Sequence, residues 1–489
     1  MRNSAAPAAL LGLALALGPG AAAAQRAPEP ALPWLSDSLS APGAGGAVET
    51  GTLGGLDRDA TGLIPAAVAG LPADLWAGGS SDRVIALLER LPPSPYPGAQ
   101  DLMQRLLLSE ADPPARGDDA LLTARVDALL RRGALDRAQA LIERAGPGTP
   151  DLFRRWFDIS LLSDSEDRAC AALEANPALV PNPMTRVFCL AREGRWSTAA
   201  LTLESGRALG DIAPEDYDLL ARFLDPDLFE GEPRLPQPAR VTPLSFRIYE
   251  AIGEPMATRD LPLAFAWSDL RFVAGWKAQL EAAERLARAG SMPGNRLLGL
   301  YTERKATVSG AIWDRVRAVQ ALDLALNSGD PAAVSAALID ARAAMSMAGL
   351  EPALAGMVAH RLTRLELKGP GAEAALRLRL LDGQLPGTIH EGAGDDLRLA
   401  LAIATGGSPD PDTGDAEALR RAAAFAAPAA AASGAVGETI LAALSQLVPG
   451  AEADAEDRAA ALGALRAAGQ EDAARRIAAD MILAGGIGR

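Results

Sequence analysis

The sequence is poor in the side chains that most often do chemistry. Among its 489 residues it has two histidines and two cysteines. A His-based zinc site needs several nitrogen or sulfur ligands, and a serine or cysteine triad needs a histidine as its base. His360 is expected in an amphipathic helix and His390 in a glycine-rich loop, so they do not form either kind of site. We therefore expect no metal, no cofactor and no catalytic residue.

Positive charge and aromatic residues are scarce as well. The formal net charge is −15, whereas nucleic acids and anionic membranes attract basic patches, so we expect neither as a partner. Aromatic residues are 4% of the chain, which suits thin interfaces between Ala/Leu-rich helices. We expect five tryptophans to be core residues rather than ligand contacts: Trp156, Trp196, Trp267, Trp276 and Trp313.

The first 24 residues have the pattern of a cleavable signal peptide. Arg2 precedes an apolar run over 8–17, and Ala22 and Ala24 supply the small residues that signal peptidase accepts. The run is shorter than the roughly 20 residues that a membrane-spanning helix needs. We expect a mature chain that begins at Gln25, has no later membrane span and lies in the periplasm.

Residues 25–78 are rich in Pro, Gly and Ala and show no sustained helical period. Such a segment buries too little apolar area to offset its ordering entropy, so we expect a flexible low-complexity arm. Its two apolar islands, around Trp34-Leu35 and Trp76, resemble segments of secreted alphaproteobacterial proteins, a resemblance that implies no activity. Either these residues pack on the chain's own helices, or Trp34, Leu35 and Trp76 form a short motif that docks a partner.

Helical hairpins are the repeated unit of the remaining chain. The turn residues Gly133, Asp164 and Gly194 lie 31 and 30 positions apart, between amphipathic runs. A period of this length indicates stacked helical hairpins. No stretch alternates apolar and polar residues over more than a few positions, as a half-buried strand would. The sequence predicts an all-α fold, an α-solenoid of stacked hairpins behind a flexible arm.

Proline and glycine divide this solenoid into blocks. The prolines between 226 and 243 favour an extended connector over a helix, and a polar gap follows Gly406. Within the second block we expect one long helix over 267–289. The predicted order is a signal peptide over 1–24, the arm over 25–78, helical block 1 over 79–224, a connector over 225–243, helical block 2 over 244–405, a polar loop over 406–417 and a C-terminal helical block over 418–489.

The turns share a Gly-x-x-Asp-x-Ala frame, seen at Gly133 and Asp136 and again at Gly469 and Asp472. Glycine permits a positive φ, Asp or Ser can cap the second helix, and alanine lets the helices approach closely. This frame resembles the tetratricopeptide and related α-hairpin families. The family's Trp/Leu/Gly/Tyr set is missing and the period is shorter than 34, so the resemblance concerns architecture. It implies a concave groove for a peptide or a partner protein.

The two cysteines suggest a covalent link. Cys170 and Cys189 are expected on the helices that flank the connection 176–183, at equal distances from its middle. In an antiparallel hairpin such residues face each other, and Cα atoms within about 7 Å can be bridged. The alternative is a pair of buried apolar thiols. We predict a disulfide, because the expected compartment is oxidising.

One short segment suggests an enzyme. Glu204-Ser205 resembles the Glu-Ser pair of lytic transglycosylases, although the family's downstream Gly-Leu-Met-Gln segment is absent. Our leading hypothesis is a non-enzymatic periplasmic scaffold or adaptor that binds a protein or peptide. The alternative is an enzyme of peptidoglycan remodelling in the cell envelope, or its accessory subunit. The sequence leaves the identity of the partner and the oligomeric state open.

Overall fold

The computed structural model describes residues 57–91, 93–114, 118–180, 182–385, 393–406, 435–448 and 455–484. Nearly all regular structure in these residues is helical, and the strands β1 (Ile64–Pro65) and β2 (Ser109–Glu110) form a single two-residue parallel pair. The all-α prediction is confirmed. Across the described ranges, no helix is long and apolar enough to cross a membrane.

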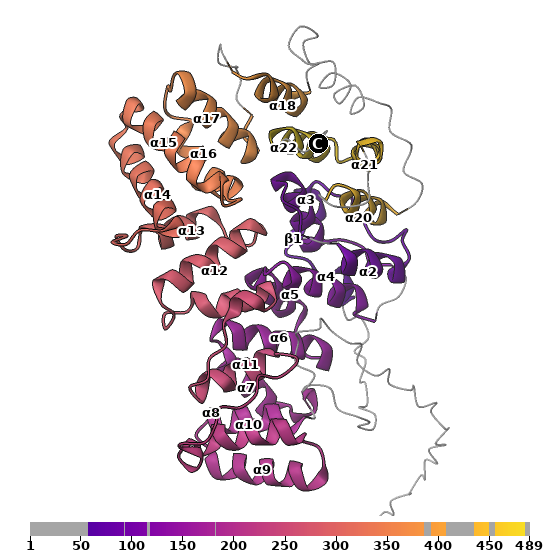
Figure 1. Cartoon of the computed structure of the whole chain (residues 1–489). Coiled ribbons are helices and arrows are strands. Elements are labelled where there is room, and N and C mark those ends of the chain that lie inside the picture. Colours follow the sequence, from indigo (N-terminus) through magenta and orange to yellow (C-terminus); the bar gives the residue numbers. More distant parts are fainter. Residues whose placement is uncertain are drawn as a thin grey trace, which may run out of the picture.

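The first half of the chain is a succession of helices in which each helix from α3 onward packs on the next one, while α2 packs on α4. In Figure 1 the later members extend away from the earlier ones, so that α9 lies at one extremity. These helices are α2 (Ser81–Arg90), α3 (Pro97–Leu108), α4 (Ala120–Arg131), α5 (Leu135–Ala145), α6 (Pro150–Ser163), α7 (Glu166–Ala175), α8 (Pro183–Arg192), α9 (Trp196–Leu209) and α10 (Pro214–Leu224).

The second half is helical too, with short 3-10 segments between some helices. The 3-10 segments are η4 (Pro226–Phe229), η5 (Thr258–Asp260) and η6 (Leu263–Leu270). The α-helices are α11 (Pro243–Ala251), α12 (Trp276–Arg288), α13 (Gly294–Thr302), α14 (Ala311–Ser328), α15 (Pro331–Ser346), α16 (Glu351–Leu362), α17 (Gly369–Leu381), α18 (Asp395–Thr405), α20 (Val436–Gln446), α21 (Ala455–Ala467) and α22 (Glu471–Leu483).

The predicted helix over 267–289 is wrong. The structure divides this range into the end of η6, a turn at residues 271–275 and α12. Arg271 holds the turn, because its Nε donates to the Ser268 carbonyl at 2.8 Å and its own carbonyl accepts from Gln279 Nε2 at 3.1 Å. The amphipathic pattern continues through the turn, but η6 packs on α4 and α6, whereas α12 packs on α13 and α16.

The proline-rich range 225–243 is extended between η4 and α11 and is bound along its length. Arg222 donates to the Pro233 carbonyl, and the Tyr249 hydroxyl donates to the Pro236 carbonyl at 2.7 Å. Beyond it, α11 packs back on α6, and η6 contacts α4 and α6. Figure 1 shows α11 returning beside α6 and α7. The two predicted blocks therefore share one packed interface.

The prediction of a flexible arm over 25–78 is wrong for its described part, residues 57–78. This part forms η2 (Arg58–Ala60), β1 and α1 (Ala66–Ala69), and it buries Leu71 and Leu75. The buried Arg125 guanidinium fixes it by donating to the carbonyls of Asp59, Thr61, Leu107 and Ser109 at 2.7–3.3 Å. Composition alone did not indicate this order, because the partners come from α3 and α4.

The C-terminal helices close the structure onto its beginning. α22 packs on α3, and α20 packs on α2, as Figure 1 also shows. We call these two helix pairs together the closing contact. Gln470 Nε2 donates to the Gly70 carbonyl at 2.8 Å, and the Gly437 amide donates to the Leu75 carbonyl at 3.0 Å. The described parts of the predicted C-terminal block over 418–489, residues 435–448 and 455–484, thus pack on the N-terminal core.

The predicted turn residues occupy the left-handed region of backbone conformation. Gly133, Asp164, Gly194 and Gly469 have φ values of +69°, +61°, +76° and +78°, each between consecutive helices. The capping role predicted for the following Asp is wrong at Asp136 and Asp472, whereas Asp330 caps α15 by accepting from the Ala332 and Ala333 amides. Asp136 and Asp472 lie inside the first turns of α5 and α22, and the N-cap residues Ala134 and Gln470 make no side-chain cap. An acidic side chain in the first turn still favours the helix through the macrodipole.

Candidate functional site

An open groove of about 720 Å³ lies between α20 and α21, next to the start of α2. This volume falls in the range of typical ligand sites. The floor is made of alanines and the rim is polar. The lining residues are Arg83, Ala435, Glu438, Thr439, Ala442, Ala443, Gln446, Asp457, Ala460, Ala461 and Ala464.

Small side chains give this groove its shape. Ala443 and Ala461 are buried between the two helices, while Ala460 is exposed and Ala442 and Ala464 are half-buried. A floor without large side chains lets a backbone approach closely, as an apolar helix or an extended peptide would require. The groove therefore offers surface for packing rather than a shaped pocket for a small ligand.

The polar rim is already engaged in the protein's own structure. Glu438 Oε1 accepts from the Ser80 amide at 2.6 Å, at the N-cap of α2, and its Oε2 pairs with Arg83 Nε at 3.1 Å. The Thr439 hydroxyl donates to the Ala435 carbonyl at 3.1 Å. Glu438 is thus a helix cap and ion-pair partner. The rim supplies charge and hydrogen-bonding groups, but no nucleophile paired with a base.

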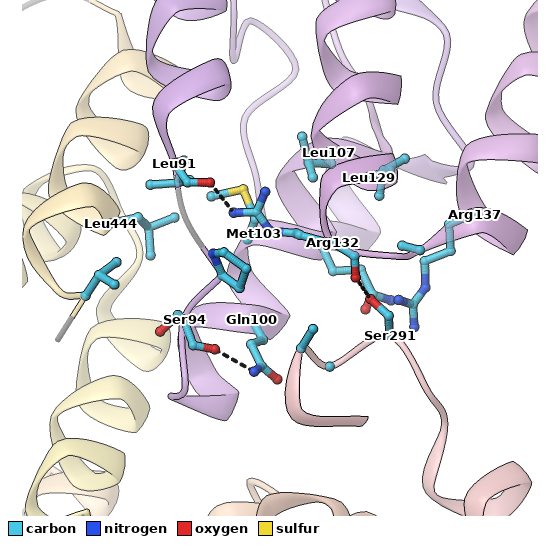
Figure 2. Close-up of a pocket in the computed structure, with 17 residues that line it drawn as sticks. Leu91, Ser94, Gln100, Met103, Leu107, Leu129, Arg132, Arg137, Ser291 and Leu444 are labelled. Atoms are coloured by element: carbon cyan, nitrogen blue, oxygen red, sulfur yellow. Dashed lines mark hydrogen bonds between the residues drawn. The ribbon is translucent and has the colours of Figure 1, made fainter. Parts of the chain in front are cut away.

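A smaller cavity, shown in Figure 2, lies where three distant parts of the chain meet. Its walls come from α3, from the turn between α4 and α5, from residues 289–291 after α12, and from the end of α20. The free space is about 30 Å³, enough for about one water molecule. This size excludes a substrate or cofactor.

Hydrogen bonds within the chain occupy the polar groups around this cavity. Gln100 Nε2 donates to the Ser94 carbonyl at 2.6 Å, and the Ser291 hydroxyl donates to the Arg132 carbonyl (Figure 2). Burial lowers the pKa of Arg132 to about 10, so this guanidinium is still charged at neutral pH. The cavity is a structural junction that joins the α4–α5 turn to the segment after α12.

An exposed apolar pair marks a second surface. Phe272 is 94% exposed and Val273 is 76% exposed, at the turn between η6 and α12. Arg271 holds this turn in place. Its guanidinium donates to the Glu250 carboxylate, in addition to the bonds with Ser268 and Gln279 described above. This exposed apolar pair is a second candidate surface for contact with another molecule.

The two cysteines form the disulfide that the sequence predicts. Cys170 on α7 and Cys189 on α8 are bonded, with Cα atoms 5.3 Å apart. Both side chains are buried, with exposed fractions of 2% and 4%. The bond closes the α7–α8 hairpin inside the core and has no contact with either surface described above.

The predicted docking motif is not supported at Trp76. Trp34 and Leu35 lie outside the described residues, whereas Trp76 is fully buried. A Cβ on Gly437 of α20 would lie 2.5 Å from the Trp76 ring, so this ring is packed directly against the backbone of α20. Trp76 is a core residue of the closing contact, which was the alternative that the sequence left open.

Four of the other tryptophans pack as core residues and one does not. Trp156 and Trp267 are buried, and Trp276 and Trp313 pack on each other with ring centroids 5.1 Å apart. Trp196 is 52% exposed and lies tilted against Phe223, with ring centroids 6.5 Å apart. The expectation for Trp196 was wrong, because no helix of the described residues lies outside α9.

The remaining candidates for chemistry do not come together. His360 lies exposed on α16, and His390 lies outside the described residues. Within the described ranges, no three His, Cys, Asp or Glu side chains are grouped to hold a metal ion. Glu204 is exposed on α9, and the hydrogen bonds from Tyr217 and Arg207 lower its pKa. A glycosidase acid needs the opposite, a carboxyl whose pKa is raised by burial.

No protein-family model, curated protein or solved structure matches this chain. The function must therefore be argued from the residues themselves. The sequence predicted a groove through its resemblance to helical-hairpin families, but not where the groove lies. The clustered alanines at 442–443 and within 455–467 were its local signal, and alanine is common throughout the chain.

Proposed function

We propose that the protein is a non-enzymatic helical-repeat scaffold or adaptor, exported to the periplasm, that binds a protein or peptide. The stacking of hairpins is supported by helix pairs in which consecutive helices pack together, such as α8–α9, α14–α15 and α21–α22. Left-handed turn residues recur between such helices. Solenoids of this kind offer long surfaces for binding other proteins.

The export proposal has its own support. Residues 1–24, which lie outside the described residues, carry the signal-peptide pattern. The disulfide between Cys170 and Cys189 is weakly compatible with an oxidising compartment. A fusion of residues 1–30 to a reporter enzyme that is active only outside the cytoplasm tests this point. A reporter that stays in the cytoplasm would contradict it.

The α20–α21 groove is the binding surface that we propose, and its volume and alanine floor carry the argument. An alanine floor accommodates the backbone of a helix or peptide, and Arg83 and Asp457 on the rim offer charges of both signs. The occupant should be a segment with small or apolar residues on one face. Affinity would come from packing along the groove rather than from one deep pocket.

The test is affinity capture from periplasmic extract with wild-type protein and two matched variants. Ala460→Trp fills the groove at an exposed position on α21, and Ala208→Trp places the same side chain on the exposed α9. We expect a partner that wild type and Ala208→Trp retain and that Ala460→Trp loses. Retention by all three proteins, or by none, would contradict binding in the groove.

The Phe272–Val273 turn is the competing surface for the same function. The double variant Phe272→Ser/Val273→Ser removes its apolar tip without altering a buried side chain, because both residues are almost fully exposed. If this variant loses the partner while Ala460→Trp retains it, the scaffold proposal stands and the binding surface moves to this turn.

The enzymatic alternative has a direct test. Muropeptide release from purified sacculi is measured with wild type and with Glu204→Gln. Because Glu204 is exposed and hydrogen-bonded to Tyr217 and Arg207, we expect no release that depends on it. Release by wild type that Glu204→Gln abolishes would replace the scaffold proposal with the enzymatic one.

A further inference from the structure

Carboxylates from distant parts of the chain cap the first three helices of the packed array. Glu438 of α20 accepts from the Ser80 amide at the start of α2, and Asp480 of α22 accepts from the Gly98 amide at the start of α3, at 2.7 Å. Asp59 accepts from the Leu122 amide in the first turn of α4 at 2.7 Å. The free N–H groups of a helix start need such acceptors. Two of these three acceptors belong to the C-terminal helices.

Asp480 is the most enclosed of the acceptors in the closing contact. Its exposed fraction is 2%, and its Oδ1 atom is buried without a hydrogen-bond partner. The fit around it is tight, because a Cβ on Gly98 would lie 3.1 Å from Asp480 Oδ2 and 3.0 Å from Arg476 Cγ. A charged carboxylate in this position lacks most of the solvation that it has when α22 is detached.

The charged surroundings of Asp480 offset only part of this loss. Arg476, on the same helix, attracts the carboxylate, but its guanidinium is shared with Asp101 of α3 at 3.8 Å and with the Leu381 carbonyl. Burial outweighs this attraction and the Gly98 bond, and raises the pKa of Asp480 to about 7. The other titratable groups on the elements packed around α22 are Tyr96, Asp101 and Arg105 at α3, Glu373, Arg377 and Arg379 on α17, Asp395, Asp396 and Arg398 on α18, and Glu456, Asp457, Arg458 and Arg466 on α21.

We propose that protonation of Asp480 controls how tightly the C-terminal helices bind α2 and α3. The neutral carboxyl keeps an oxygen that accepts from the Gly98 amide and removes a buried charge, so the closing contact is tight at mildly acidic pH. At alkaline pH the carboxyl is ionised and the contact loosens. This proposal does not depend on the proposed function.

Linkage gives the size of the effect. In the detached state Asp480 is solvated and titrates near its ordinary value of about 3.9, whereas in the closed state its pKa is about 7. Closing then takes up a proton throughout the range between these values. The closing equilibrium should weaken by about 30-fold between pH 5.5 and pH 8.

Hydrogen–deuterium exchange on the full chain, corrected for the intrinsic pH dependence of exchange, measures this equilibrium locally. We expect protection in α22 and α3 to fall by about 30-fold from pH 5.5 to pH 8 in wild type. Asp480→Asn keeps an acceptor for Gly98 and cannot ionise, so its protection should not depend on pH. Asp59→Asn is the matched control, because Asp59 lies against α4 and its loss should leave the pH response of α22 unchanged.

Two results would overturn the proposal. One is protection of α22 in wild type that is equal at both pH values. The other is a pH response of α22 that Asp480→Asn preserves. If Asp480→Asn does not fold, Arg476→Gln provides the test, since removal of the nearby positive charge should move the midpoint of the response to higher pH. A midpoint that stays in place or moves to lower pH would count against Asp480 as the titrating group.

Discussion

A comparison of two turn glycines tests whether the two halves of the chain are packed as one body. Gly133 and Gly194 both follow the first helix of a hairpin and have nearly the same φ, +69° and +76°. They differ in their surroundings. A Cβ on Gly133 would lie 2.6 Å from Leu286 Cδ2 and 2.9 Å from Leu263 Cγ, whereas a Cβ on Gly194 would meet nothing within 4 Å.

Both substitutions to alanine therefore lower the free energy of unfolding through backbone strain, but only Gly133→Ala lowers it further through overpacking. The left-handed backbone costs an L-residue about 1–2 kcal/mol, and both variants should lose this much. Gly133→Ala adds overpacking, about 1–3 kcal/mol in a filled core. Leu286 is fully buried and has no space to turn away, while the half-buried Leu263 can shift. We expect Gly133→Ala to destabilise the protein by about 1–3 kcal/mol more than Gly194→Ala.

Urea unfolding followed by circular dichroism at 222 nm measures both free energies of unfolding. A second readout is the fluorescence of Trp267, whose Nε1 donates to the Gly133 carbonyl at 2.6 Å, so the environment of this indole should change only in Gly133→Ala. Gly469→Ala is a further control, because its Cβ would also meet nothing within 4 Å. Equal losses in all three variants would refute the packing of the second half on the α4–α5 turn.

Three further changes test other parts of the structure. Arg125→Ala leaves four buried carbonyls without their donor and should cost at least about 3 kcal/mol in urea unfolding, against about 0.5 kcal/mol or less for the exposed Arg259→Ala. Cys170→Ala/Cys189→Ala should lose about 3 kcal/mol, and thiol labelling that finds two free cysteines in periplasmic protein would contradict the disulfide. Burial raises the pKa of Asp59 from 3.8 to about 6, so the folded state binds its proton more tightly than the unfolded state. The free energy of unfolding should then fall by about 2.4 kcal/mol as the pH rises from 4 to 7, relative to Asp59→Asn measured over the same range.

The sequence predicted the local structure well where one hairpin determines it. Amphipathic runs bounded by turn residues predict helices over 166–175, 197–208 and 332–347, and α7, α9 and α15 match these ranges to within one residue at each end. Apolar periodicity, Gly or Asp turns and helix-starting prolines act over a few residues, so a single sequence contains them. The Cys170–Cys189 pair followed from the same local symmetry, because both residues belong to one hairpin.

The ordered structure of residues 57–78 could not be predicted from local sequence patterns. Among the large apolar residues of the segment, Leu71, Leu75 and Trp76 are buried against other elements, whereas Leu63 and Val68 stay exposed. The hydrogen bonds that hold it come from distant residues. The Arg125 guanidinium donates to the carbonyl of Thr61, 64 positions away, and the Gly437 amide donates to the Leu75 carbonyl. Composition estimates what a segment buries by itself, and it contains no information about partners that arrive later in the chain.

The α20–α21 groove escaped prediction for the same reason as the closing contact. Its walls are α20 and α21, and its rim includes Arg83 at the start of α2, so the rim is complete only once the two ends of the chain have met. Small residues at 442, 443, 460 and 461 are needed for its floor, but alanines of the same kind fill ordinary helix interfaces elsewhere, as Ala138 and Ala199 do. The pattern predicts close packing and does not distinguish a filled interface from an open one.

The closing contact also explains why the two ends of the helical array differ. Each end of a helical stack exposes a face that would otherwise bury apolar side chains against the next repeat. At the first end, α20 and α22 cover α2 and α3 and cap their free amides. At the other end, α9 packs on α8 and α10 and has no helix outside it in the described structure; Trp196, Leu201 and Leu209 stay exposed there. Since α11 turns the chain back beside α6, the array ends at α9, and the C-terminal helices are available to cover its beginning.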